Sequence, residues 1–287
     1  MSRVAFVNGR YVPHALASVH IEDRGYQFGD AVYEVWLVAA GRLCDAEGHF
    51  ARLERSLGEL AIPAPMSRRA LEIVLRETLR RNRVRDGLLY LQVSRGVARR
   101  DHPFPVPAPA PAIVITARSL DPAAGAAKAA KGVAVITTPE SRWGRCDIKT
   151  VNLLPNVLAK QAAKAAGAYE AWFVDELGFV TEGSSTNAWI VDREGVLRTR
   201  DIQANILRGV TRAAVLKVAA EQGLTLAERP FAMSDVLEAK EAFITGASTQ
   251  VTPVVSIDGR KVGAGEPGPV AKRLRQLYIA EARREAV

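Results

Sequence analysis

Residues 146–152 have the sequence CDIKTVN, and they hold the best candidate for a covalent active-site residue, Lys149. Lysine is scarce in this chain: only nine of the 39 basic residues are lysines, and none precedes Lys128. We predict a strand over residues 132–138 and a helix over 151–166, with Lys149 between them. A desolvated amine among other cations becomes a nucleophile because its neutral form is favoured. The alternative is a surface lysine at the start of a helix, and only the rest of the chain distinguishes the two.

Length and composition predict two globular domains. The chain has 287 residues, of which 48% are hydrophobic, and single cores tend to stop growing near this size. We expect a smaller N-terminal α/β domain over residues 1–118, a turn-forming linker over 119–126 and a larger C-terminal domain over 127–287. Predicted strands, hairpins and helices occur in both halves, so the expected fold class is mixed α/β (α+β), with mixed sheets flanked by helices.

Local patterns predict several individual elements. Asn8-Gly9 is typical of a two-residue hairpin turn. The strand predicted over residues 32–39 places Tyr33 on one face and Glu34 on the other. Helices are expected over residues 67–82, with a serine cap, and from about 208 to 222. Residues 179–187 are predicted to form a polar corner before the next strand.

The basic composition leaves a binding protein without catalysis as an alternative. The formal charge of +8 suits nucleic acid or an anionic ligand, but the arginines are dispersed beside glutamates on predicted helix faces. No nucleic-acid-binding motif is present. Cys44, Cys146 and the four histidines have no metal-ligand spacing, so we expect no metal and two reduced thiols. With no apolar run of about 18 residues and no leader, the expected location is the cytoplasm.

Three segments are candidate anion sites. Gly209, Val210 and Thr211 begin a predicted helix, whose free N–H groups can receive a phosphate. Residues 246–249 form a second small, hydroxylated turn, and Arg52 is a third contributor. The long proline-rich loop over residues 95–111 is either a functional lid or mere surface. Grouped around one phosphate near a lysine, the three candidates would describe a cofactor pocket.

The ordered motifs resemble those of the fold-type IV pyridoxal-phosphate enzymes and, within them, the D-amino acid aminotransferases. The resemblance covers nearly the whole chain and implies their two-domain architecture. Several motifs in order are more specific than any one alone, so the resemblance favours the nucleophile interpretation of Lys149. The matching segments are residues 23–34 (DRGYQFGDAVYE), 95–96 (RG), 146–149 (CDIK), 181–185 (TEGSS), 207–212 (LRGVTR) and 252–253 (TP).

The resemblance implies a role for each candidate residue around pyridoxal 5′-phosphate. Lys149 would hold the cofactor through its amine and move the substrate proton. Glu182 would face the pyridine nitrogen and keep it protonated, so that the ring accepts electrons. Ala247 stands where relatives often carry threonine, which leaves open whether Ser248 supplies a hydroxyl. The implied phosphate ligands are Arg52, the N–H groups of Val210 and Thr211, and the turn of Gly246, Ala247 and Ser248.

The resemblance also implies the substrate and the assembly. Tyr33, Arg100 and His102 would bind the substrate α-carboxylate, because all three side chains can donate hydrogen bonds. The loop that carries Arg100 and His102 comes from the partner subunit in the family, which implies a homodimer. The expected reaction is transamination between D-amino acids such as D-alanine and 2-oxo acids such as 2-oxoglutarate. A branched-chain L-amino acid aminotransferase and a 4-amino-4-deoxychorismate lyase remain the alternatives within the fold.

Arg142 and Trp143 are expected to be structural.

Overall fold

The computed structural model describes residues 3–203 and 205–287, which fold into two compact units. Unit 1 comprises Met1–Asp121, Ile148–Asn152 and Glu285–Val287. Unit 2 comprises Pro122–Asp147 and Leu153–Arg284. The segment that carries Lys149 therefore belongs to unit 1, although the chain on both sides of it belongs to unit 2.

Unit 1 is built on a six-stranded antiparallel sheet with the order β2-β1-β6-β5-β3-β4. The hairpin predicted at Asn8-Gly9 is confirmed, and both residues have the positive φ angles (46° and 89°) that its tight turn requires. The strands are β1 (Val4–Val7), β2 (Arg10–Pro13), β3 (Ala31–Ala39), β4 (Arg42–Leu43), β5 (Gly87–Ser94) and β6 (Ala112–Ser119).

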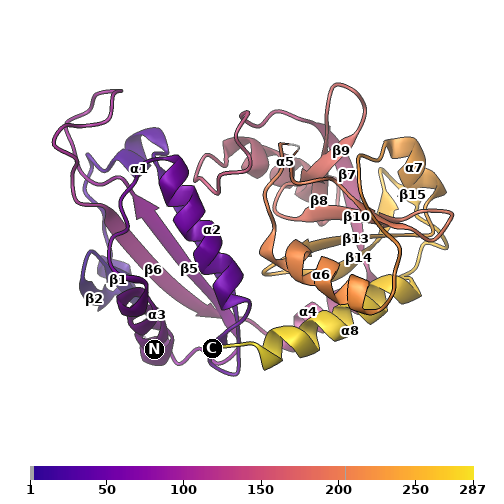
Figure 1. Ribbon diagram of the computed structural model, residues 1–287, viewed down its shortest axis with the longest axis horizontal. Helices are drawn as coiled ribbons and strands as arrows, with labels where there is room; N and C mark the ends of the chain where they lie inside the picture. The colour runs from indigo at the N-terminus through magenta and orange to yellow at the C-terminus, as the bar shows by residue number, and fades with distance from the viewer. Residues whose placement is uncertain (1–2, 204) are drawn as a thin grey trace. The chain divides into compact units, whose positions relative to one another are not determined.

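Helices α2 (Ala46–Glu59) and α3 (Arg68–Asn82) cover one face of this sheet (Figure 1). Phe50 of α2 packs against the fully buried Trp36 of β3, with 5.4 Å between the ring centroids. Ser67 caps α3 as predicted, because its hydroxyl accepts a hydrogen bond from the Ala70 N–H. The remaining helices of the unit are the short η1 (His14–Leu16) and α1 (Arg24–Phe28).

A buried ion pair fastens α2 to β3. Glu34 is fully buried and accepts hydrogen bonds from Arg52 Nε at 2.7 Å and Nη2 at 2.8 Å. His49 Nδ1 lies 2.7 Å from the same carboxylate. Burial alone would raise the pKa of Glu34, but Arg52 and His49 outweigh it and lower the pKa to about 2. The folded unit therefore stabilises the ionised form of Glu34.

Glu34→Gln is expected to destabilise unit 1 by about 3–5 kcal/mol at pH 7, because Arg52 is left buried without its counter-charge. A folded pKa of about 2, below the ordinary value of 4.5, means that the wild-type stabilisation is present above pH 4.5 and declines toward pH 2. The difference between wild type and variant should shrink over that window. Urea denaturation at several pH values measures it.

Glu59→Gln is the matched control, since Glu59 forms a surface pair with Arg55 at 3.4 Å on the same helix. Its loss should cost less than about 1 kcal/mol. Equal costs for the two substitutions would contradict the role of Glu34.

Unit 2 contains a nine-stranded mixed sheet with the order β12-β11-β10-β13-β14-β7-β8-β9, and β15 pairs with β14. The mixed α/β class predicted for the chain is confirmed, and its parallel pairs lie in this unit. The strands are β7 (Val133–Pro139), β8 (Glu170–Val174), β9 (Val180–Gly183), β10 (Asn187–Val191), β11 (Leu197–Thr199), β12 (Leu226–Glu228), β13 (Glu241–Gly246), β14 (Gln250–Ile257) and β15 (Arg260–Lys261). The helices are α4 (Pro122–Lys131), α5 (Leu154–Ala165), α6 (Val210–Glu221), α7 (Met233–Glu238) and α8 (Pro269–Arg284).

None of the helices described in either unit is long and apolar enough to cross a membrane.

Three local expectations differ from the structure. Residues 122–126, expected in a linker, begin α4, because an alanine-rich run has the highest helix propensity and Pro122 suits a first helical turn. The helix expected from residue 151 begins at Leu154, since residues 149–151 pair with β3 and Pro155 occupies the first turn. Part of the corner expected over residues 179–187 is strand β9. Tertiary strand pairing decided the last two.

Candidate active site

The backbone of residues 149–151 extends the sheet of unit 1. The Tyr33 N–H donates to the Lys149 carbonyl at 3.0 Å, and the Val151 N–H donates to the Ala31 carbonyl at 3.2 Å. Val32 and Thr150 form an antiparallel bridge between these bonds. Because β4 pairs only with the end of β3, the first half of β3 is free to accept this segment. Lys149 is thereby placed beside Tyr33.

The Lys149 side chain is half-buried against aromatic rings. Its Nζ lies 4.2 Å from the centroid of the Tyr33 ring, and that ring lies 5.7 Å from the ring of Tyr90. The Tyr90 hydroxyl donates to Gln92 Oε1 at 2.7 Å. Burial, aided by Tyr33, raises the pKa of Tyr90 to about 12, so this phenol stays neutral. The structure thus brings together two of the predicted site residues, Lys149 and Tyr33.

Arg52 and Glu34 form a buried ion pair beside β3. Arg52 is 9% exposed and its guanidinium binds Glu34, on the face of β3 opposite to Tyr33. The sequence indicated Arg52 as a phosphate ligand but not its ion pair. Its contact with phosphate stays a prediction.

Arg100 and His102 lie together on an exposed loop of unit 1. The Arg100 guanidinium is 5.1 Å from the centroid of the Phe28 ring, and the His102 ring is 5.6 Å from it. Both side chains are exposed. One aromatic ring at the end of α1 therefore holds both predicted carboxylate ligands, while Tyr33 contacts Lys149 instead.

Glu182 of β9 is the centre of a buried polar cluster in unit 2. It is 4% exposed; Oε1 accepts from the Leu207 N–H at 3.0 Å and Oε2 from Asn187 Nδ2 at 2.9 Å. Arg142 Nη1 also donates to Oε1. Burial raises the pKa of Glu182, while Arg142 and the Leu207 N–H oppose the shift. The carboxylate is therefore held by three donors at some desolvation cost.

Arg142 and Asn187 are residues whose roles the sequence analysis missed. Arg142 was expected to be structural, and it does bind Glu140 through two bonds of 2.8 and 2.6 Å, but its third donor reaches Glu182. The spacing of Glu140 and Arg142 was the available signal. Asn187 bridges Glu182 to the Leu207 carbonyl at 3.1 Å, which no local pattern indicates.

The predicted phosphate segments of unit 2 meet at the start of β10. Helix α6 begins at Val210 as predicted, without an acidic residue in its first turn or a side-chain cap on its N–H groups. An added Cβ on Gly209 would lie 1.9 Å from Asn187 Oδ1, so the backbone passes close to this side chain. The turn 247–249 follows β13, and Gly246 lies against the backbone of Ser185.

The chemistry of these groups fits a phosphorylated pyridine aldehyde. Free N–H groups at the start of α6 suit a phosphate. A buried carboxylate suits a protonated ring nitrogen, because the cation would offset its desolvation. The half-buried amine of Lys149 suits covalent attachment to an aldehyde. Ser248 is exposed, Ala247 is half-buried, and both roles at the phosphate stay predictions.

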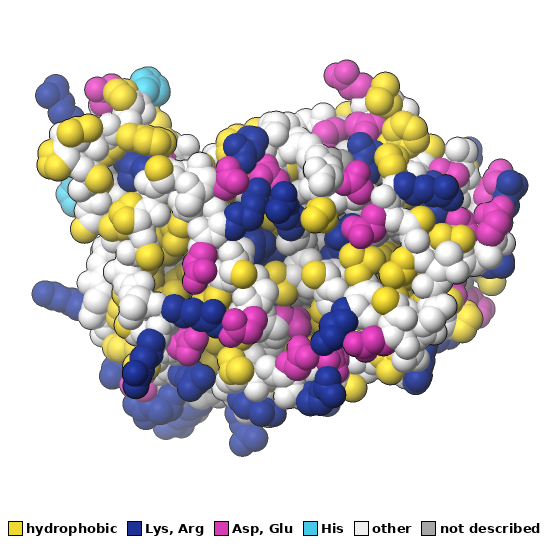
Figure 2. Space-filling model, viewed as in Figure 1, with side chains coloured by type: hydrophobic (Ala, Val, Ile, Leu, Met, Phe, Trp, Pro, Cys, Tyr) yellow, Lys and Arg dark blue, Asp and Glu magenta, His cyan; other side chains and the backbone are white. Residues whose placement is uncertain are grey.

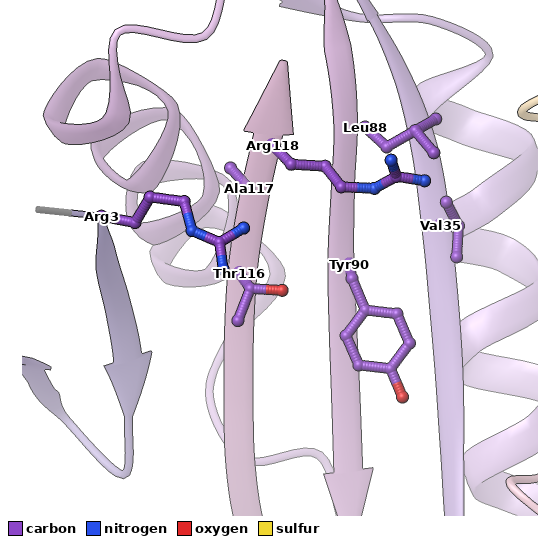
Figure 3. A pocket seen from close by; sticks show the side chains of 7 residues that line it. All are labelled: Arg3, Val35, Leu88, Tyr90, Thr116, Ala117 and Arg118. Atoms are coloured by element: carbon purple, nitrogen blue, oxygen red, sulfur yellow. The ribbon is translucent and has the colours of Figure 1, made fainter. Parts of the chain in front are cut away.

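A small pocket on the open face of the unit 1 sheet is a separate feature. Figure 3 shows its lining side chains, which include Val35, Tyr90 and Arg118, in front of strands β3, β5 and β6, with helices behind the strands. Its volume of 160 Å³ is well below the roughly 300 Å³ of ordinary cofactor pockets. We therefore do not assign the cofactor to it.

Comparisons with known proteins agree with this chemistry. The architecture is that of the fold-type IV aminotransferases: the branched-chain amino acid aminotransferase of Escherichia coli superposes with a TM-score of 0.90 at 25% identity, covering 98% of this chain and 95% of that one. A second branched-chain amino acid aminotransferase, from T.th. and solved with pyridoxamine 5′-phosphate, gives 0.90 at 29% identity over 99% and 96%. The sequence profile of the family Amino-transferase class IV matches residues 31–257, and the chain belongs to this family.

Relatives found by sequence comparison include D-alanine aminotransferases. The D-alanine aminotransferase of Bacillus licheniformis is 41% identical over 93% of both chains. The D-alanine aminotransferase of Listeria monocytogenes is 38% identical over 96% of this chain and 94% of its own.

Gly209→Ala is expected to destabilise unit 2 by about 1–3 kcal/mol, because the new methyl group displaces Asn187 and weakens its bond to Glu182. Urea denaturation measures the change. Gly125→Ala in α4 is the control, since its Cβ would meet no atom within 4 Å. Alanine there should be neutral or stabilise by up to about 1 kcal/mol. Equal stability of the two variants would rule out the close contact.

Proposed function

We propose that this protein is a pyridoxal-phosphate-dependent aminotransferase that moves an amino group between D-amino acids, such as D-alanine, and 2-oxo acids, such as 2-oxoglutarate. Membership of the class IV family supports the reaction type. The observation that carries the choice of D-amino acids is the pair of Arg100 and His102, presented together on Phe28. The names of the sequence relatives point to the same substrates.

Lys149 would hold the cofactor through its amine, be released when the substrate amine takes its place, and as a free amine remove the proton from the substrate Cα. The cofactor, when bound, supplies an electron sink for the pair left on that carbon. The centroid of the Tyr33 ring lies 4.2 Å from Nζ, so the ring covers one side of the amine and restricts its movement. The backbone pairing with β3 fixes the position of the Lys149 backbone, and so the point from which its amine extends.

Glu182 would bind the ring nitrogen and stabilise its protonated form. Its two bonds to Leu207 and Asn187 leave the carboxylate little freedom to turn. The Arg142 guanidinium favours the ionised form of Glu182 against the effect of burial, which raises its pKa. An ionised, oriented carboxylate is the state that can keep a pyridine nitrogen protonated. The N–H groups of Val210 and Thr211 would bind the phosphate.

Tyr33, Arg100 and His102 would bind the substrate α-carboxylate and so determine handedness. A guanidinium offers a forked pair of donors, and imidazole and phenol add one each. The exposed position of Arg100 and His102 suits a role toward the site of a partner subunit. Loss of one charged donor should cost about 1.5–3 kcal/mol, or ten- to a hundredfold in kcat/KM.

Two reactions of the same fold are the competing proposals. Branched-chain aminotransferases are similar in structure, at 25–29% identity, and a 4-amino-4-deoxychorismate lyase would keep Lys149 and Glu182 as well. Neither reaction requires the pair of Arg100 and His102. The relatives at 37–41% identity are D-alanine aminotransferases, which favours the D-amino acid proposal.

Purified protein with pyridoxal phosphate, D-alanine and 2-oxoglutarate is expected to yield pyruvate and D-glutamate. Arg100→Ala should lower kcat/KM for D-alanine ten- to a hundredfold, because a charged donor to the carboxylate is lost. A lactate dehydrogenase assay measures the pyruvate. Equal turnover of L-alanine, or an unaffected Arg100→Ala variant, would sink the proposed specificity. Arg99→Ala, the preceding exposed arginine, is the matched control.

We also propose that the protein is a homodimer. Helix α5 exposes Leu154, Val157 and Leu158 by 69%, 58% and 62%, and their spacing places them on one face of the helix. Such a stripe is typical of a surface that another chain covers. The open sheet face of unit 1, with half-buried Tyr90, is a second candidate surface. A dimer would also supply the partner site that Arg100 and His102 require.

Light scattering is expected to give twice the chain mass of 31.0 kDa for the wild type. Leu158→Glu should shift the protein toward the monomer, because a buried unpaired charge opposes association. Lys164→Glu, an exposed change on the same helix, should leave the mass unchanged. A monomeric wild type would refute the dimer.

The proposed compartment is the cytoplasm, and the proposed partners are small amino acids and 2-oxo acids rather than nucleic acid or membrane. The thiols of Cys44 and Cys146 are buried. Burial raises the pKa of the Cys146 thiol to about 12, which keeps it protonated and unreactive. Reduced thiols are the ordinary state in that compartment.

A further inference from the structure

Asp30 is the common partner of two buried arginines in unit 1. Arg24 Nε donates to Asp30 Oδ2 at 2.8 Å, and Arg95 donates to both carboxylate oxygens at 2.7 and 3.0 Å. The arginines are 3% and 4% exposed. One carboxylate therefore orients two guanidinium groups, and each guanidinium has further N–H groups that can bind other residues.

The other donors of Arg24 bind the loop that carries Arg100 and His102. Nη1 donates to the Asp101 carbonyl at 2.6 Å, and Nη2 donates to the His102 carbonyl at 3.2 Å. The Arg24 guanidinium also lies 4.7 Å from the Phe28 ring, the ring that both loop side chains contact. Helix α1 thus holds this stretch of loop through its backbone and through its side chains.

Arg95 contacts both the same loop and the residues that follow α2. It donates to the carbonyls of Leu60 and Ala61 at 2.6 and 3.1 Å, after the end of α2, and lies 3.5 Å from the Phe104 ring. The base of the loop is closed at Gly96, whose φ of 101° and close approach to the Ala110 carbonyl exclude a side chain. The Arg24 N–H also donates to the Gly96 carbonyl at 3.0 Å, while its side chain binds the stretch near Arg100.

Arg100 and His102 have little else to keep them in place. Both are exposed, at the end of unit 1 that holds α1, where Figure 2 shows apolar, basic and histidine side chains close together. A free loop would lose conformational entropy whenever it bound a carboxylate, and that loss weakens binding. A loop already ordered by Arg24 avoids most of this loss.

We propose that Arg24 is a positioning residue that orders the loop of residues 99–104 and so presents Arg100 and His102 to the substrate carboxylate. The inference rests on the proposed function for its catalytic consequence, although the ordering of the loop does not. The forked guanidinium is necessary because it must reach Asp30 and two carbonyl groups at once, which a lysine ammonium on a single stem cannot do with the same geometry.

The experiment compares Arg24→Lys, with Arg24→Ala as the stronger variant, and Arg198→Lys as the matched control. Arg198 is 8% exposed and binds the Pro230 carbonyl at 2.7 Å and Asp235 at 3.3 Å in unit 2, so its loss has a similar structural cost away from the loop. Trypsin cleavage after Arg99 and Arg100, quantified by mass spectrometry on the cofactor-loaded protein, measures loop order. Steady-state kinetics with D-alanine measure its consequence.

Arg24→Lys should accelerate cleavage at the loop by about tenfold or more, the equivalent of one charge-assisted hydrogen bond. It should raise KM for D-alanine by about tenfold and change kcat less than about threefold, because substrate and transition state lose the same contact. In protein that already carries Arg100→Ala and His102→Ala, Arg24→Lys should lower kcat/KM no further. Arg198→Lys should change none of these quantities.

Unchanged loop cleavage in Arg24→Lys and Arg24→Ala would overturn the inference, as would equal acceleration in Arg198→Lys. A full additional loss in the Arg100→Ala, His102→Ala background would overturn it too, since Arg24 would then act by another route. Accelerated cleavage together with normal D-alanine turnover in Arg100→Ala would overturn the proposed function instead and leave the ordering of the loop supported.

Discussion

The antiparallel pairing of residues 149–151 with the first half of β3 is the constraint on which the position of Lys149 depends. Two backbone hydrogen bonds, of 3.0 and 3.2 Å, join residues 149 and 151 to β3 of unit 1. The chain on both sides of this segment belongs to unit 2. The pairing needs an open strand edge, which exists because β4 is only two residues long. A lysine in an unpaired loop has a variable position relative to the sheet, whereas a lysine whose backbone is hydrogen-bonded to a strand has a fixed one.

The same strand uses its two faces for different purposes. Tyr33 faces the amine of Lys149, while Glu34 faces α2 and holds Arg52. The alternation of a strand makes this separation automatic, because neighbouring side chains point to opposite faces. The ion pair of Glu34 with Arg52 thus fastens to α2 the strand whose other face carries Tyr33.

Buried charge is paired throughout both candidate regions, and in each case a second residue decides what the first can do. Arg142 favours the ionised form of Glu182 in unit 2, and Asn187 ties the carboxylate to the approach of α6. In unit 1, Asp30 orients Arg24 toward the loop. A charge removed from water is costly unless it is paired, so each of these partners stabilises the buried charge beside it.

Prediction from sequence succeeded where the signal was local. The turn at Asn8-Gly9, the cap at Ser67 and the start of α6 at Val210 follow from conformational preferences of single residues, and the structure confirms them. It failed at residues 151–153, which were expected in a helix: Val151 pairs with β3 instead, and the helix begins only at Leu154. The ion pairs Arg52–Glu34 and Arg142–Glu182 were also out of reach, since they join residues 18 and 40 positions apart.

The order of residue types along the chain was enough to identify the family, the mixed α/β class and the chemical groups: an amine, a carboxylate, a helix start and an Arg-x-His loop. These follow from residue types in order along the chain, which need no folding to be recognised. Which of these groups are neighbours, and which are held in place, depends on contacts between distant segments of the folded chain. In the folded protein, the last five residues of the segment 146–152 belong to unit 1 with its sheet. The Arg24 side chain binds the loop that carries Arg100. The reason is physical: backbone pairing and buried charge act through space, between segments that the chain itself keeps far apart.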